Sequence, residues 1–306
     1  MDNSCYIIYI RQDERVYLRL FEKIVRFICK IFFIVRCESL DGEKIIIVPK
    51  KKRYTKLDII IIKNKASIAK NGIDNYYIVL DKNLNFLKDS LDASKVLDGK
   101  LLMKNSIQQI LDYIFLCNGQ NMNLENIYVL VNKYTKENVY LIRNLIQNFK
   151  TVNIITDDLK HFKLLENRVF KEGILITVSN NKRKGVKNAR YIVNLDFTKE
   201  DVSMYNINPN AVILNCVKEI NIIEKGFNGI IVNNMEVELN SDIDEYMKEF
   251  YGNIDSKIYL ESCLIKCDYY SLKTEKGYLE NDGSIIGLYG IRGILSKHEI
   301  YENCRK

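Results

Sequence analysis

The sequence predicts an α/β protein with a doubly wound parallel sheet, preceded by a small α+β domain at the N-terminus. Short apolar runs alternate with segments of helical spacing between residues 126 and 235. These runs are apolar throughout, as expected for strands buried on both faces of a sheet. The chain has 306 residues, which is enough for about two domains with their own cores.

The expected strands of the central domain lie at residues 127–131, 152–156, 174–178, 191–195, 212–216 and 229–232. Helical spacing fills residues 135–149 and 158–172, between the first three of these runs. A strand, a helix and a second strand in this order form a right-handed crossover, which places the two strands parallel. We therefore expect neighbouring strands of this sheet to be parallel.

An amphipathic helix is expected at residues 14–30. Its charged side chains recur at helical spacing on one side, and its apolar side chains lie on the other: Leu20, Ile24, Phe27, Ile28 and Ile31. The interspersed charges, including Lys23, Arg26 and Lys30, exclude a membrane-spanning helix. We expect the apolar side to pack on its own domain, in preference to lying on a membrane surface.

The rest of the N-terminal domain is expected to consist of strands. Apolar runs at residues 31–35 and 44–48 flank Asp41 and Gly42, a dipeptide typical of hairpin turns. Further runs lie at 57–62 and 76–80. We place the α+β domain at residues 1–103, the doubly wound domain at 104–240, and a helical or irregular extension at 241–306. Within that extension, helices are expected at 241–251 and 257–267, and an irregular glycine-rich segment at 283–293.

The composition and the net charge limit the functional classes that fit this sequence. The net charge of +7, from 46 Lys and Arg against 39 Asp and Glu, is too small to indicate a polyanion partner unless it is clustered. The first residues lack the basic start, apolar core and small-residue cleavage site of a signal peptide. We therefore expect a cytoplasmic protein without a transmembrane segment, whose eight cysteines are reduced. No pair of cysteines has CxxC spacing, so no metal site is expected.

The order strand, helix, strand, helix, strand over residues 127–178 resembles the cofactor half of shikimate, methylene-tetrahydrofolate and amino-acid dehydrogenases. The resemblance covers about one third of the chain and implies a Rossmann-like domain. It further implies a nucleotide pyrophosphate at the first strand-to-helix turn, and an acid after the second strand that bonds the ribose hydroxyls. Asp157 or Asp158 occupies that second position, although Asp158 is equally placed to cap the following helix.

The first strand-to-helix turn departs from this family. Residues 131–138 read Val-Asn-Lys-Tyr-Thr-Lys-Glu-Asn and contain no glycine, and Tyr134 is bulky where a phosphate would approach the backbone. Thr135 is a good helix cap. The turn is therefore a degenerate version of the family's loop, and we expect no cofactor, with NAD(P) as the alternative.

Two basic segments are candidate binding sites. Lys182, Arg183, Lys184 and Gly185 follow the strand at 174–178 and are placed to bind a phosphate or carboxylate, although a solvated basic loop would look the same. Lys50, Lys51, Lys52 and Arg53 lie in the most basic part of the chain and could contact nucleic acid, but they match no known nucleic-acid motif. Neither histidine, His161 or His298, belongs to a recognised catalytic motif.

Three functions remain. The favoured one is a non-catalytic Rossmann-like scaffold or regulatory protein that binds a protein partner or a small acidic ligand. The second is an NAD(P)-dependent oxidoreductase with an atypical cofactor loop. The third is a nucleic-acid-associated protein that uses the basic N-terminal segment. The sequence leaves the ligand, the partner and the oligomeric state open.

Overall fold

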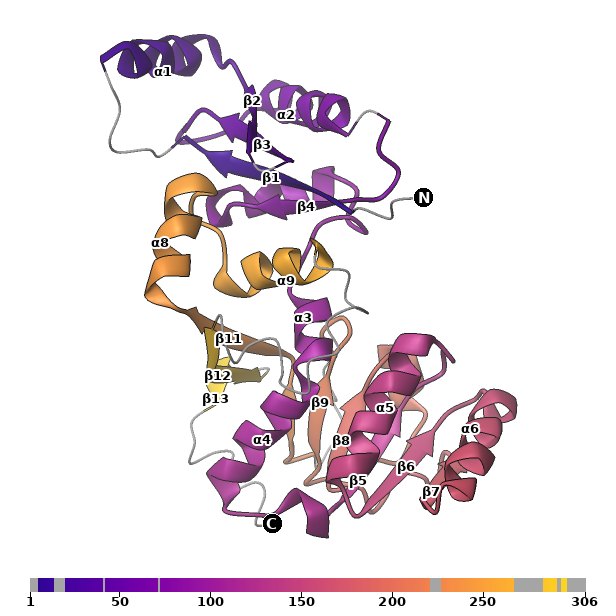
Figure 1. Cartoon of the computed structure of the whole chain (residues 1–306). Coiled ribbons are helices and arrows are strands. Elements are labelled where there is room, and N and C mark those ends of the chain that lie inside the picture. Colours follow the sequence, from indigo (N-terminus) through magenta and orange to yellow (C-terminus); the bar gives the residue numbers. More distant parts are fainter. Residues whose placement is uncertain are drawn as a thin grey trace. The chain divides into compact units, whose positions relative to one another are not determined.

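The computed structural model describes residues 5–13, 20–40, 42–70, 72–220, 227–266, 283–290 and 293–295. The chain forms two compact units (Figure 1). The first contains Met1–Leu102 and Glu238–Ser284, and the second contains Met103–Val237 and Ile285–Lys306. Helices α8 (Ser241–Phe250) and α9 (Ser256–Lys266), which the sequence prediction assigns to a separate extension, thus belong to the first unit.

The second unit is built on a six-stranded sheet with the order β10-β9-β8-β5-β6-β7. Every neighbouring pair in this sheet is parallel, which confirms the predicted doubly wound arrangement. The strands are β5 (Asn126–Leu130), β6 (Thr151–Ile155), β7 (Ile176–Ser179), β8 (Tyr191–Asn194), β9 (Val212–Asn215) and β10 (Ile230–Val232). The chain runs outward from β5 in one direction to β7, and from β8 in the other direction to β10. The strand order therefore reverses between β5 and β8.

Helices α5 (Lys136–Asn148) and α6 (Leu159–Lys171) connect the first three strands and cover one face of the sheet (Figure 1). Each buries one stripe; in α6 it consists of Phe162, Leu165 and Val169 at spacings of three and four residues. The remaining helices of this unit are η2 (Met122–Leu124), α4 (Ile107–Asn118), α7 (Lys199–Ser203) and, at the boundary of the units, α3 (Lys100–Asn105).

The first unit has a four-stranded sheet with the order β2-β3-β1-β4. Strands β1 (Tyr6–Gln12), β3 (Glu43–Val48) and β4 (Tyr76–Leu80) are parallel, while β2 (Arg36–Leu40) pairs antiparallel with β3. The hairpin predicted at Gly42 is therefore confirmed, and Gly42 has the positive φ of 83° that such a turn requires. The central strand β1, which is almost completely buried, is absent from the sequence prediction.

The run at 57–62 is a helix, so the predicted strand there is wrong. Helix α2 (Lys56–Ala69) starts at a capping box, in which the Thr55 hydroxyl accepts from the Asp58 N–H and the Asp58 carboxylate accepts from the Thr55 N–H. Only one side of the run is buried, at Ile62 and Ala66, while Leu57 is exposed. A run of isoleucines satisfies either period, and here the local cap favours the helix.

The strand predicted at 31–35 is also wrong, because helix α1 (Leu20–Phe32) continues through its first half. The helix ends at Phe33, which has a left-handed φ of 48°. The Ile34 N–H then donates to the Cys29 carbonyl at 2.9 Å, as in a Schellman motif. The partner of β3 in the hairpin is consequently β2, which starts at Arg36.

The expected packing of the apolar side of α1 is wrong as well. Cys29 is buried, but Ile24, Phe27, Ile28 and Ile31 are all exposed. Within the described residues, no helix is long and apolar enough to cross a bilayer.

The glycine-rich segment predicted to be irregular contains two strands, β12 (Gly283–Gly290) and β13 (Gly293–Leu295). Together with β11 (Asn234–Leu239) they form a three-stranded sheet with the order β11-β12-β13. Glycine has a low intrinsic tendency to form strands, and pairing with the neighbouring strands overcomes it here. His298 lies outside the described residues. The first unit also contains η1 (Lys82–Ser90).

Candidate functional site

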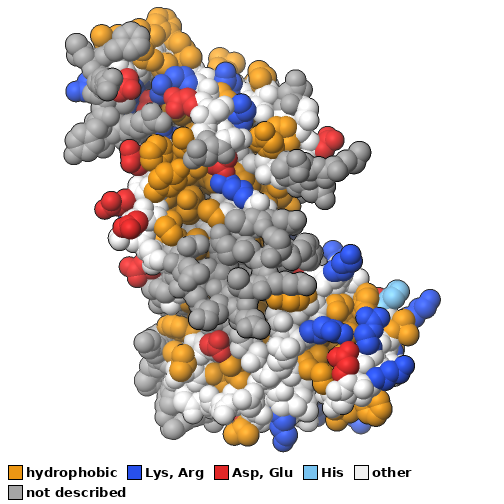
Figure 2. All heavy atoms as spheres, in the orientation of Figure 1, with side chains coloured by type: hydrophobic (Ala, Val, Ile, Leu, Met, Phe, Trp, Pro, Cys, Tyr) orange, Lys and Arg blue, Asp and Glu red, His pale blue; other side chains and the backbone are white. Residues whose placement is uncertain are grey.

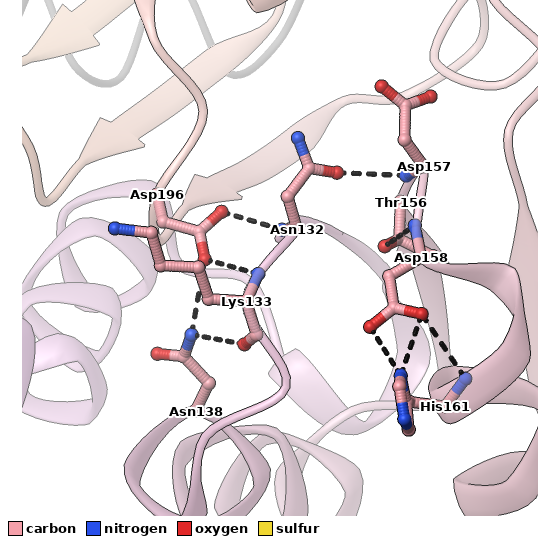
Figure 3. Close-up of polar contacts among 8 residues, drawn as sticks. All are labelled: Asn132, Lys133, Asn138, Thr156, Asp157, Asp158, His161 and Asp196. Carbon is pink, nitrogen blue, oxygen red and sulfur yellow. Dashed lines mark hydrogen bonds and ion pairs between the residues drawn. The ribbon is translucent and has the colours of Figure 1, made fainter.

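The candidate site is the carboxyl edge of the six-stranded sheet, at the point where the strand order reverses. Open parallel sheets bind their ligands at this position, because the loops after two neighbouring strands diverge there. The loop after β5 leads to α5, and the loop after β8 carries Asp196. The loop after β6 carries Asp157 and Asp158 (Figure 3).

Asp196 accepts the hydrogen bonds of the β5–α5 turn. Its carboxylate lies 2.6 Å from the Asn132 backbone N, 2.8 Å from the Lys133 backbone N and 3.2 Å from the Asn138 side-chain N (Figure 3). The Asn138 amide also donates to the Lys133 carbonyl at 2.8 Å, which closes the turn. These two backbone N–H groups belong to the turn that holds the pyrophosphate in dinucleotide-binding sheets. In this chain they are bonded to an anion that the protein itself supplies.

Side chains of the turn fill the space on its other side. The ring of Tyr134 lies 5.2 Å from the Phe162 ring and 5.5 Å from the His161 ring. Thr135 caps α5 by accepting from the Asn138 N–H, as the sequence predicts. The turn is thus fixed from both sides, by Asp196 and by the packing of Tyr134 on α6.

Asp157 and Asp158 lie together at the end of β6 but have different surroundings. Asp158 caps α6, and its carboxylate contacts the His161 Nδ1 at 2.8 Å. The Asp157 backbone N–H donates to the Asn132 side-chain oxygen, whereas the Asp157 carboxylate points away from the other labelled side chains in Figure 3. The capping role proposed for Asp158 is therefore present, and Asp157 is the acid whose carboxylate faces outward.

Two titratable side chains near this edge of the sheet are Tyr205 and His161. Burial, followed by the charges of Asp157 and Asp201, raises the pKa of Tyr205 to about 12. This hydroxyl therefore stays protonated near neutral pH and cannot act as a base there. His161 is half exposed and is oriented by a carboxylate three residues away on its own helix, an arrangement common to helix caps.

Three buried asparagines form a row at the carboxyl ends of β8, β9 and β10. Asn194, Asn215 and Asn233 follow or end β8, β9 and β10. The Asn194 amide donates to the Asn215 oxygen at 2.9 Å, and the Asn215 amide donates to the Asn233 oxygen at 2.7 Å. The row also binds backbone groups of the following loops, including the Phe197 N–H. These amides hold the loops in place, and sequence reasoning did not identify them.

The basic loop after β7 lies at the edge strand of the sheet, away from the reversal point. The Asn181 side chain accepts from the N–H groups of Arg183 and Lys184 at 3.1 and 3.0 Å, so those donors are used within the loop. A Cβ at Gly185 would lie 2.6 Å from the Asn181 carbonyl, so glycine is needed for this close approach. The side chains of Lys182, Arg183 and Lys184 are exposed.

The four basic residues at positions 50–53, in the first unit, have different surroundings. Lys51 forms an ion pair with Asp58 at 2.8 Å and lies over the Phe33 ring. Lys52 and Arg53 are exposed. Lys50 lines a pocket of about 310 Å³ at the carboxyl end of β1 and β3, together with Lys23, Arg26, Lys30, Phe27, Pro49 and Asp13. Asp13 is engaged by Arg26 and by Arg36, the latter at 3.1 Å.

The cysteines within the described residues, which are all except Cys267 and Cys304, form no disulfide bonds with one another. In the same part of the chain, no group of three or more His, Cys, Asp or Glu side chains is arranged to hold a metal ion.

The sequence matches no family model and no curated protein. Among solved structures, the chain is similar to L-tryptophan dehydrogenase from Nostoc punctiforme, with a TM-score of 0.35, 9% identity, and coverage of 98% of this chain and 80% of that one. It is also similar to shikimate dehydrogenase from Aquifex aeolicus, with a TM-score of 0.33, 9% identity, and coverage of 99% and 98%. Ornithine transcarbamoylase from Giardia lamblia has a TM-score of 0.33, 10% identity, and coverage of 87% of each chain. Likenesses this distant carry no argument about activity, and the fold assignment rests on the strand order and parallel pairing described above.

Proposed function

We propose that this chain is a non-catalytic Rossmann-like scaffold or regulatory protein that does not use a dinucleotide cofactor. The observation that carries the proposal is the position of Asp196, whose carboxylate accepts both N–H groups of the β5–α5 turn. A dinucleotide pyrophosphate would need the same donors, and it would have to approach a carboxylate of the same sign of charge.

The energetic consequence is large enough to measure. Hydrogen bonds to a charged group contribute roughly 1.5–3 kcal/mol each. A pyrophosphate that cannot form two of them loses about 3–6 kcal/mol, which moves a micromolar dissociation constant to the millimolar range or beyond. Exposed lysines such as Lys133 would attract phosphate, but their contribution is weak and sensitive to salt.

Calorimetric titration of the full chain with NAD⁺ and NADP⁺ at moderate salt tests this proposal. We expect no binding with a dissociation constant below about 50 μM, a threshold set by the affinity arithmetic. Tighter binding by the unmodified chain would refute the proposal. A titration of Asp157→Ala would then show whether the outward-facing carboxylate contacts the ribose.

That outcome would favour the second candidate, an NAD(P)-dependent oxidoreductase with an atypical loop. One observation supports it: Asp157 follows the second strand of the sheet, and its carboxylate faces outward (Figure 3). In dinucleotide-binding sheets an acid at this position bonds the ribose hydroxyls.

A small acidic ligand remains part of the favoured proposal, with Lys182, Arg183 and Lys184 as its contacts. Since the loop's backbone donors at Arg183 and Lys184 are bonded to Asn181, only the exposed side chains are left to bind it. A thermal-shift screen of acidic metabolites against the chain and against Lys182→Gln/Lys184→Gln tests this. A ligand at 100 times its dissociation constant stabilises the fold by about 2.7 kcal/mol. The contact assignment is wrong if a ligand stabilises both proteins equally.

A further inference from the structure

The apolar stripe of α1 is exposed along the length of the helix. Ile24, Phe27, Ile28 and Ile31 follow one another at spacings of three, one and three residues, which places them on one side of a helix. Their exposed fractions are 52%, 65%, 43% and 59%, and the apolar surface continues at Phe32 and Ile34. Figure 2 shows hydrophobic side chains gathered over this helix. Burying such a stripe is the usual reason for an amphipathic helix, and here its own unit does not bury it.

A stripe of cations lies beside the apolar stripe. Lys23, Arg26 and Lys30 are spaced by three and four residues, so they share a second side of α1. The helix contains one acid, Glu22, against these three cations. Lys50 lines the same pocket as the three cations, so a loop of the sheet adds to their charge. The acid in this pocket, Asp13, is paired with Arg26 and Arg36.

We propose that α1 binds to the surface of an anionic lipid bilayer. In this arrangement Phe27 and the isoleucines enter the boundary between headgroups and acyl chains, while Lys23, Lys30 and Lys50 contact lipid phosphates. A strongly amphipathic helix with cations beside a stripe of large apolar side chains is the pattern of helices that lie in the membrane interface. The helix is too short and too charged to span the bilayer.

Charge favours a lipid surface over a second copy of this chain. A symmetric dimer in which the two α1 helices pack antiparallel would place both cationic stripes on the same side of the contact, where they repel each other. An anionic bilayer instead meets the cations with opposite charge, at a gain of about fivefold in binding for each lysine or arginine near the surface.

Flotation of the full chain with vesicles tests the proposal. We expect binding to vesicles of equal parts phosphatidylglycerol and phosphatidylcholine, weaker binding in high salt, and weaker binding to phosphatidylcholine alone. Phe27→Ser/Ile31→Ser should weaken binding at least about tenfold, because both apolar contacts with the interface are lost. The matched control is Leu164→Ser/Phe170→Ser, since these side chains on α6 are 57% and 66% exposed and should not matter.

The cations are tested in the same way. Lys23→Gln/Lys30→Gln should weaken binding by about 25-fold, from about fivefold per cation. Lys160→Gln/Lys171→Gln removes two exposed cations from α6 in the second unit and should leave binding unchanged. Circular dichroism and thermal melting confirm that each variant is folded.

A spectroscopic measurement locates the contact directly. The chain has no tryptophan, so Phe27→Trp introduces a single reporter on the apolar stripe. Its emission should shift to shorter wavelength on addition of the anionic vesicles, whereas that of Phe170→Trp should not shift.

Three results would overturn the proposal. One is the absence of binding to the anionic vesicles by the folded wild-type chain. Another is binding that the Phe27 and Lys23 variants retain in full. The third is self-association of the wild-type chain that Phe27→Ser/Ile31→Ser abolishes while vesicles are not bound, since a second copy would then cover α1. None of these results depends on the nucleotide titration, so this proposal and the proposed function fail independently.

Discussion

Replacing Asp196 with alanine tests whether this carboxylate holds the β5–α5 turn in place. The substitution removes the acceptor of three hydrogen bonds, from the backbone N–H groups of Asn132 and Lys133 and from the Asn138 side chain. The Lys133 N–H can bond water in its place, because that contact is exposed. The other two donors are partly buried and lose more.

Counting those two bonds at about 1.5 kcal/mol each, the low end of the range for charged partners, gives a loss of about 3 kcal/mol in the free energy of unfolding. For a domain of 150–250 residues, each kcal/mol lowers Tm by about 2–4 °C, so Tm should fall by about 6–12 °C. Asp196→Asn keeps one acceptor oxygen without the charge, and about half of the loss is expected.

Urea unfolding followed by circular dichroism measures the difference. Asp157→Ala is the matched control, because Asp157 is an acid on the same edge of the sheet and its carboxylate faces outward (Figure 3). A loss below about 0.5 kcal/mol for Asp196→Ala, the size typical of surface substitutions, would refute the structural role of this carboxylate. An equal loss in Asp157→Ala would refute it as well.

Three further predictions test the packing of both units. Burial raises the pKa of Glu261 above its ordinary value, so the folded chain holds a proton that the unfolded chain has released. Stability should therefore fall as pH rises from about 4.5 through the folded pKa, and Glu261→Gln should remove this part of the pH dependence of urea unfolding. Gly99→Ala should destabilise by more than Gly72→Ala, because both glycines have positive φ but only a Cβ at Gly99 meets the Lys257 side chain, at 2.1 Å. Lys257→Ala should abolish that difference in a double-mutant cycle, and an unchanged difference would place the strain elsewhere. Asn215→Ala should cost about 2–4 kcal/mol in urea unfolding, since it removes the buried hydrogen bonds that Asn215 forms with Asn194 and Asn233, and a loss under 1 kcal/mol would contradict the structural role of the row.

The doubly wound sheet is predictable from the sequence because its signals are local. Each parallel strand is a short apolar run, and the helices between the first strands have their own caps at Thr135 and Asp158. The predicted runs and the observed strands agree within about two residues throughout this sheet. Nothing outside each segment is needed to recognise it.

The first unit is harder because its segments are ambiguous by themselves. The isoleucine run before Ile62 fits a strand or a helix, and the cap formed by Thr55 and Asp58 decides between them. Strand β1 contains the buried Arg11 and ends in polar Gln12, so its sequence does not look like a central strand. The exposure of the apolar stripe of α1 could not be predicted, since amphipathic spacing is the same whether a helix packs on its own domain or on something else.

The candidate site could be predicted from the sequence only in part, and the reason is different. The absence of glycine at residues 132–138 is a local signal, and from it the sequence predicts an altered turn. Asp196 is 64 residues from Asn132 and reaches it because β8 pairs with β5. Once the strand order is predicted, the sequence can be searched for an acid directly after the strand that neighbours β5. Asp196, which follows β8, is such an acid.

Asp196 and the asparagine row have the same consequence for function. Along the carboxyl edge of β5, β8, β9 and β10, polar groups that could meet a ligand are bonded to other parts of the chain. Such internal partners must be displaced before a ligand can bind, and each displaced bond to a buried group costs about 1–3 kcal/mol. The situation is reversed at α1, where large apolar side chains are already exposed, so their contact with a partner displaces no internal hydrogen bond. On these energetic grounds we expect a partner to contact α1 more readily than the edge where this fold usually binds its ligands.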